Sequence, residues 1–261
     1  MASSLIRGLL AKEINAQSIW AADIDELKLQ QLRDECGINT SSVEQIADSV
    51  DVIVLAVKPQ VMKEVCEQLA SGRLERSPLI VSIAAGINTS HLQSWLGEGT
   101  AIVRCMPNTP ALIGKGASGL FANKFVTDDQ KQLAEQIMAA VGLSVWVVAE
   151  TDIDTVTAVS GGGPAYFFLF MEAMQNTAKE MGISEELARQ LTYQTALGAA
   201  ELALNSTDEI AVLRRNVSSP GGTTEQAIKI FEAGGLRELV ASALRAARDR
   251  SIELADEFGQ K

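Results

Sequence analysis

Short apolar segments alternate with helical segments up to Glu150, and the alternation then stops. Each apolar segment has the length of a buried strand, and most are followed by a helical pattern. Continuous apolar strands separated by helices are typical of a doubly wound parallel sheet, so we predict an α/β fold for this part. The predicted strands are Ser18–Ala22, Asp51–Val57, Leu79–Ile83, Ala101–Cys105, Ser118–Ala122 and Ser144–Val148.

After Glu150 the chain is rich in alanine and reads as helix throughout, with one break at Gly161-Gly162-Gly163-Pro164. Small residues suit close helix packing and a subunit interface. We therefore predict a domain boundary near residue 150: residues 1–150 form the α/β domain, and residues 151–261 form an all-α domain that makes a homodimer or a higher homo-oligomer.

The chain opens inside a helix, where Met1-Ala2-Ser3-Ser4-Leu5 looks like the tail of the GxGxxA turn of a Rossmann-like domain, with Ala2 at its last position. The first strand and both glycines of that pattern are missing, so we expect a chain starting here to bind a dinucleotide poorly. Asp23 lies 21 residues after Ala2, where an acid commonly accepts the ribose 2′-OH of NAD. Alternatively, Asp23 caps the following helix.

Charge and composition exclude several classes of function. The formal net charge of −11 argues against nucleic acid or an anionic membrane surface as a partner. No apolar run reaches the ~18 residues of a membrane span. The three cysteines are scattered without CxxC spacing, which indicates a reducing cytoplasm and no zinc site. With His91 as the single histidine, we predict no metal centre.

The most informative local motif is Ser218-Ser219-Pro220-Gly221-Gly222-Thr223-Thr224, between two predicted helices. A helix N-terminus attracts anions, because its first N–H groups lack partners and the helix dipole is positive there. Thr223 and Thr224 can reach a ligand with their hydroxyls. Alternatively, the motif is an ordinary Pro-Gly-Gly turn with a threonine as the helix N-cap.

Four motifs together resemble the pyrroline-5-carboxylate reductase family, which performs the last step of proline synthesis. They are Ala56-Val57-Lys58-Pro59, Arg104-Cys105-Met106-Pro107-Asn108-Thr109-Pro110, Ser160-Gly161-Gly162-Gly163-Pro164-Ala165-Tyr166, and Ser218 to Thr224. Each motif alone is weak, but their order and spacing are specific, and the resemblance covers essentially the whole chain. The resemblance implies that a small-molecule substrate, the cyclic imine 1-pyrroline-5-carboxylate, is reduced to L-proline. The hydride would come from the reduced form of NADP or NAD.

The resemblance also implies site residues. Thr224 is implied as the catalytic group, hydrogen-bonded to the ring nitrogen, and backbone N–H groups of the loop would bind the substrate carboxylate. The implied substrate-binding residues are Ser160, Gly163, Val217, Gly221, Gly222, Thr223 and Thr224. Gly162 stands where many members of the family have serine, so a hydroxyl contact is lost there or taken by water.

The cofactor is expected at the carboxyl ends of the strands, where small residues let it approach the backbone. The implied cofactor-binding residues are Met1, Ala2, Asp23, Ala56, Val57, Lys58, Pro59, Ala84, Ala85, Gly86 and Asn108. Close strand-to-helix packing is an alternative explanation for Ala84-Ala85-Gly86, and Lys58 is alternatively a surface charge. Asp23 and Asp25 would repel a 2′-phosphate, so we expect a preference for NADH over NADPH.

Two other functions stay open from the sequence. A related two-domain hydroxyacid dehydrogenase or ketopantoate reductase would use a catalytic lysine on its helical domain. Lys179 is the one lysine on the first long helix, and its surroundings do not resemble such a motif. An inactive helical scaffold is the second alternative, because the phosphate-binding turn is absent.

Overall fold

The computed structural model describes residues 1–47, 49–71 and 77–259, and the chain divides into two compact units. The first unit comprises residues 1–162 together with residues 246–261, and the second comprises residues 163–245. The end of the helical half thus belongs to the first unit. The predicted domain boundary near residue 150 stays a prediction, because a compact unit and a domain need not coincide.

The first unit alternates strands and helices, as predicted. Its strands are β1 (Trp20–Ala21), β2 (Asn39–Thr40), β3 (Val52–Leu55), β4 (Leu79–Ser82), β5 (Ile102–Met106), β6 (Gly116–Ala122) and β7 (Gly142–Trp146). Its helices are α1 (Ala2–Ala11), α2 (Glu26–Cys36), α3 (Val43–Ala47), α4 (Met62–Ser71), α5 (Thr89–Leu96), α6 (Asp128–Ala139) and α7 (Asp152–Val156). Local chemistry sets several ends: Asp25 caps the start of α2, and Gly37 ends it in a left-handed conformation.

Five strands form one sheet in the order β3-β4-β5-β6-β7, and β1 pairs with β2 in a separate parallel ladder. The predicted doubly wound parallel sheet is confirmed as a sheet dominated by parallel pairs, with one exception: β5 and β6 are antiparallel. Their connection, Pro107–Lys115, holds only a 3-10 helix (Thr109–Ile113). A parallel crossover needs about a dozen residues or more, so the strand returns in the opposite direction. The short strand β2 was not predicted.

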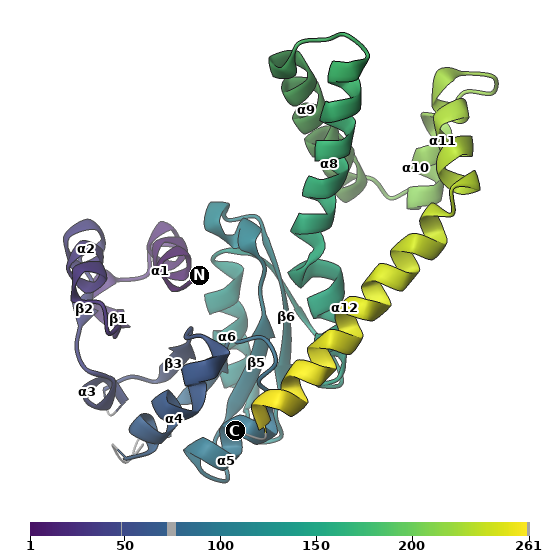
Figure 1. Cartoon of the computed structure of the whole chain (residues 1–261). Coiled ribbons are helices and arrows are strands. Elements are labelled where there is room, and N and C mark those ends of the chain that lie inside the picture. Colours follow the sequence, from purple (N-terminus) through teal and green to yellow (C-terminus); the bar gives the residue numbers. More distant parts are fainter. Residues whose placement is uncertain (48, 72–76, 260–261) are drawn as a thin grey trace. The chain divides into compact units, whose positions relative to one another are not determined.

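Alternate residues of the central strands face two apolar cores. On one face, Leu79 and Val81 of β4 pack in a cluster with Leu5 of α1 and Met138 of α6. On the other face, Ile80 packs in a cluster that α4 and α5 also form. Helices therefore cover both faces of the five-stranded sheet (Figure 1). This arrangement leaves the carboxyl ends of the parallel strands β3, β4 and β5 at one edge.

The second unit consists of helices, as predicted: α8 (Gly163–Glu180), α9 (Glu185–Asn205), α10 (Ile210–Asn216), α11 (Thr223–Ala233) and the first part of α12 (Leu236–Gly259). α8 and α9 form a helical hairpin (Figure 1). Many large apolar side chains of this unit are exposed in the single chain, among them Phe167 and Leu169, each 68% exposed, and Leu239, 67% exposed. No helix within the described residues is both long and apolar enough to cross a membrane.

Candidate active site

A tight turn joins α10 to α11 and contains the Ser218–Thr224 motif. Val217 is the C-cap of α10, and the Ser218 hydroxyl donates to the Arg214 carbonyl over 2.7 Å. Gly221 has a φ of +73°, a left-handed conformation that favours glycine. The Gly222 N–H then donates to the Ser219 carbonyl over 3.0 Å. These bonds fix the turn so that the chain enters α11 directly after Gly222.

The first turn of α11 presents polar groups with no protein partner. Gly222 is the N-cap, and no side chain caps this helix, so the alternative with a threonine as N-cap is wrong. Thr223 and Thr224 are exposed, and neither their backbone N–H groups nor their hydroxyls have a partner among the described residues. Free N–H groups at the positive end of a helix favour an anion such as a carboxylate.

Glu225 already places a carboxylate against this turn. Its Oε2 accepts a hydrogen bond from the Gly221 N–H over 2.9 Å and lies 3.1 Å from the Lys229 ammonium. The Gly221 N–H and then Lys229 hold the pKa of Glu225 below its usual value. The predicted contact between substrate and the Gly221 N–H therefore requires Glu225 to move away, while Thr223 and Thr224 remain free. The sequence analysis missed this bond.

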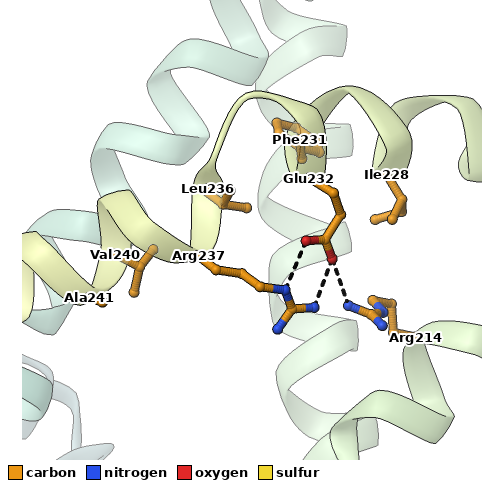
Figure 2. A pocket seen from close by; sticks show the side chains of 8 residues that line it. All are labelled: Arg214, Ile228, Phe231, Glu232, Leu236, Arg237, Val240 and Ala241. Atoms are coloured by element: carbon orange, nitrogen blue, oxygen red, sulfur yellow. Dashed lines mark hydrogen bonds and ion pairs between the residues drawn. The ribbon is translucent and has the colours of Figure 1, made fainter.

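An ion-paired cluster holds together the helices on both sides of the turn. Glu232, near the end of α11, pairs with Arg214 of α10 at 3.2 Å and with Arg237 at the start of α12 at 2.7 Å. Figure 2 shows both guanidinium groups converging on this carboxylate. They belong to a pocket of about 440 Å³ whose other lining residues are Ile228, Phe231, Leu236, Val240 and Ala241. These exposed pairs link the helices that flank the Ser218–Thr224 motif.

Ser160 lies in a single π-helical turn, Thr157–Gly161, which follows α7. Its hydroxyl donates to the Val156 carbonyl over 3.0 Å, so the hydroxyl proton is used within the helix. Its carbonyl accepts a hydrogen bond from the Asn108 side chain over 3.0 Å. π-turns inside helices are frequent at functional sites. The predicted substrate residue Gly163 is buried and begins α8.

The strands β3 and β4 end in the residues that we predicted for the cofactor. Ala56, Val57, Lys58 and Pro59 follow β3, and Lys58 is exposed with no ion-pair partner among the described residues. After β4, Ala84 is buried and Gly86 has a φ of +73°. A Cβ at Gly86 would lie 3.0 Å from the Phe258 ring, so Gly86 packs closely against α12. The strand ends thus combine small side chains with one free cation, which suits a dinucleotide.

The N-terminal candidates lie at the starts of α1 and α2. Met1 is the N-cap of α1 and Ala2 its first residue, and no side chain caps the helix, so its N-terminal N–H groups suit a phosphate. Asp23 accepts a hydrogen bond from the Asp25 N–H over 3.0 Å, whereas Asp25 caps α2. The alternative in which Asp23 caps this helix is therefore wrong. Its contact with a ribose stays a prediction.

Arg104 lies on β5, is only 3% exposed, and is the centre of a buried polar network that the sequence analysis missed. Its two terminal nitrogens lie 3.4 Å from Glu150 and 3.5 Å from Asp154. Glu150 also accepts hydrogen bonds from the N–H and hydroxyl of Thr89, and Asp154 accepts one from Ser251 of α12. An arginine within an apolar strand was the signal, because a buried guanidinium needs carboxylate partners. The network joins β5, α5, α7 and α12.

The candidates fall into one group in each compact unit. The first unit holds the predicted substrate residue Ser160 and all the predicted cofactor residues, Asn108 among them. The second unit holds Gly163, Val217 and the loop residues Gly221, Gly222, Thr223 and Thr224. In the first unit most candidates follow strand ends, while Met1 and Ala2 begin α1 and Ser160 lies in the π-turn. In the second unit Gly163 begins α8, and the other candidates lie in the α10–α11 turn.

A family model for pyrroline-5-carboxylate reductase dimerisation matches residues 150–254, and a model for coenzyme F420-dependent NADP oxidoreductase matches residues 1–86. The pyrroline-5-carboxylate reductase of Pseudomonas aeruginosa is 52% identical, over 100% of this chain and 95% of its own length. A solved pyrroline-5-carboxylate reductase from Coxiella burnetii is 47% identical with a TM-score of 0.94, covering 97% of this chain and 94% of that one.

A further solved structure, the Plasmodium falciparum pyrroline carboxylate reductase with NADP bound, is 30% identical with a TM-score of 0.82, over 97% of this chain and 94% of that one. The Rossmann-like unit and these likenesses define an NAD(P)H-dependent oxidoreductase with a helical dimerisation domain. The chain belongs to the pyrroline-5-carboxylate reductase family.

Proposed function

We propose that this chain reduces 1-pyrroline-5-carboxylate to L-proline by hydride transfer from NAD(P)H, with the Ser218–Thr224 turn as its substrate-carboxylate site. The first turn of α11 carries this proposal. It offers the free N–H groups of Thr223 and Thr224 at a positive helix end, beside two free hydroxyls. A cyclic imine that bears a carboxylate needs an anion site and a hydrogen-bonding group at its ring nitrogen, and this turn supplies both.

In this proposal the chain positions its substrate and needs no strong protein acid. The free N–H groups of Thr223 and Thr224 hold the carboxylate. The N–H groups of Gly221 and Gly222 join them after they release the Glu225 carboxylate and the Ser219 carbonyl. The Thr224 hydroxyl hydrogen-bonds the ring nitrogen, which can carry its own proton near neutral pH. Ser160 in the first unit, and Gly163 and Val217 in the second, stay predicted substrate residues. Catalysis is then mainly orientation and electrostatic complementarity.

The residues at the strand ends fit the cofactor. We assign Met1 and Ala2 to the phosphates, Asp23 to the ribose, and Lys58 with its neighbours Ala56, Val57 and Pro59 to the cleft after β3. Ala84 and Ala85 would allow the backbone after β4 to come close to the cofactor, while Gly86 already packs against α12. When bound, the reduced nicotinamide supplies the hydride.

A substrate panel tests the proposal. The purified protein is expected to oxidise NADH or NADPH with 1-pyrroline-5-carboxylate and not with 2-keto acids or ketopantoate. The alternative, a reductase with a catalytic lysine, predicts the reverse preference and loss of activity in Lys179→Met. Lys179 lies in the last turn of α8, 4.0 Å from Glu185. Activity with ketopantoate alone would contradict our proposal.

The exposed apolar surface of the second unit supports a homodimer as the minimal assembly. Phe167, Leu169 and Leu239 are each about two-thirds exposed in the single chain. So many exposed large apolar side chains on the helices of one unit are typical of a subunit interface. Light scattering at micromolar concentration is expected to give the mass of a dimer or a higher oligomer, and a stable monomer would contradict this. A cytoplasmic location stays a prediction from the cysteine pattern.

A further inference from the structure

Asn108 follows β5 and is the N-cap of the 3-10 helix Thr109–Ile113, yet its side chain does not cap that helix. Asparagine at an N-cap normally accepts hydrogen bonds from the helix that it precedes. Here the Asn108 Oδ1 accepts from the Ala117 N–H over 2.8 Å, and the Nδ2 donates to the Ser160 carbonyl over 3.0 Å. The residue is 9% exposed. The side chain therefore joins β6 to the π-turn, two segments distant in sequence.

Pro164 explains why the Ser160 carbonyl needs this donor. In a regular helix the carbonyl of residue 160 would accept a hydrogen bond from the N–H of residue 164. Proline has no N–H, and its ring also pushes away the carbonyl four residues before it. Ser160 is half-buried, and the Asn108 Nδ2 supplies the missing donor to its carbonyl.

A second contact holds the π-turn, in this case against the end of β5. A Cβ at Gly161 would lie 2.7 Å from the Cε of Met106, so glycine permits the π-turn to approach the end of β5 closely. Met106 and Asn108 thus hold the backbone of residues 160–161 by packing and by a directional hydrogen bond. The backbone position of Ser160 is set from β5.

We propose that Asn108 is a positioning residue for the reduction: it fixes the backbone of Gly161 and of Ser160, a predicted substrate residue, and does not itself bind the cofactor. This inference rests on the proposed function, because Ser160 is a substrate residue only if the chain reduces 1-pyrroline-5-carboxylate. The positioning role requires an uncharged side chain at residue 108 that donates a hydrogen bond from the Nδ2 position.

Asn108→Asp tests the donor, because a carboxylate has nearly the same shape and cannot donate when ionised. At high pH the introduced charge would face the Ser160 carbonyl, whereas at low pH the protonated carboxyl can donate again. We expect kcat/KM for 1-pyrroline-5-carboxylate, taken relative to wild type at each pH, to fall about tenfold or more near pH 8 and to recover toward about pH 5.5. The KM for the nicotinamide cofactor should change less than about twofold.

Asn123→Asp is the matched control. Asn123 is also 9% exposed, and its amide likewise links backbone groups: Nδ2 donates to the Thr100 carbonyl over 2.9 Å, and Oδ1 accepts from the Ile102 N–H over 3.2 Å. It lies at the opposite end of β5, so its loss should reduce stability without a pH-dependent change in kcat/KM relative to wild type. Equal kinetic effects of the two variants, or a flat pH profile for Asn108→Asp, would overturn the proposal.

Hydrogen exchange separates failure of this inference from failure of the proposed function. At high pH, the amides of residues 157–163 should exchange faster in Asn108→Asp than in the wild type at the same pH, whatever the substrate of the enzyme. A wild type that does not reduce 1-pyrroline-5-carboxylate would refute the proposed function, and unchanged exchange in this segment would refute the positioning role. If Asn108→Asp does not fold, the same comparison is made between Asn108→Ala and Asn123→Ala. Equal amide exchange and equal kcat/KM in these two variants would refute the positioning role.

Discussion

Removing the Arg104 guanidinium is the sharpest test of the packing that holds the first unit together. Arg104→Met keeps the apolar stem of the side chain and deletes a charge that is 97% buried, since the residue is 3% exposed. It leaves Asp154 with one hydrogen bond, from Ser251 at 2.8 Å. Glu150 keeps two, from the N–H and hydroxyl of Thr89 at 2.7 and 2.6 Å. Two carboxylates then remain near each other without their cation.

The expected cost follows from this geometry. Breaking a buried ion pair by removing one partner typically costs about 3–5 kcal/mol. The contacts of Arg104 are long, at 3.4 and 3.5 Å, and both carboxylates keep other donors. We therefore expect a loss of about 3 kcal/mol in the free energy of unfolding, which corresponds to a Tm lower by roughly 6–12 °C for a unit of this size.

Urea unfolding followed by tryptophan fluorescence measures this loss, because Trp20, Trp95 and Trp146 all lie in the first unit. Adding Asp154→Asn to Arg104→Met should restore part of the stability, since it removes one uncompensated charge. Arg7→Met is the control: the Arg7–Glu35 pair is shorter, at 2.6 Å, but exposed, so its loss should not shift the urea midpoint. A loss below about 1 kcal/mol in Arg104→Met, or no coupling to Asp154, would refute the reasoning.

Three further outcomes are expected. Thr224→Ala should lower kcat/KM for 1-pyrroline-5-carboxylate by about tenfold or more, because it loses a hydrogen bond to the substrate. The control Thr207→Ala, at an exposed loop residue, should keep the wild-type kcat/KM. Unchanged kinetics in a folded Thr224→Ala would exclude a role for Thr224. Asp23→Ser should shift the ratio of kcat/KM from NADH toward NADPH by several-fold, and a strong NADPH preference in the wild type would contradict the assignment of Asp23. Burial lowers the pKa of His91, so its contribution to stability is present above the ordinary value of about 6.5 and is lost as pH falls through the lower folded pKa. Urea titrations should therefore show a flatter loss of stability with falling pH in His91→Gln than in the wild type. An identical slope in the two proteins would contradict this.

The sequence predicted the elements of the first unit well, because their signals are local. The continuous apolar run at Leu79–Ile83 and the Asp25 and Gly37 helix ends each act within a few residues. The direction of β6 was not predicted, because it depends on the length of the connection between Met106 and Gly116, which periodicity does not register.

The candidate site was predictable where a motif contains its own geometry. Pro220-Gly221-Gly222 specifies a turn that ends in a helix start, and the structure has that turn. The network around Arg104 and the hydrogen bond from Asn108 to Ser160 join residues that lie far apart in sequence. Only the tertiary fold brings such partners together, although Pro164 already indicated that the Ser160 carbonyl would need a donor from elsewhere.

Transfer of the hydride itself tests the central claim most directly. The purified protein is given 1-pyrroline-5-carboxylate and a reduced nicotinamide cofactor that carries deuterium at the transferring carbon, and the product is analysed by mass spectrometry and NMR. We predict L-proline with one deuterium at the ring carbon that was doubly bonded to nitrogen in the substrate. Cofactor oxidation without deuterated proline, or no oxidation that depends on this substrate, would contradict the account.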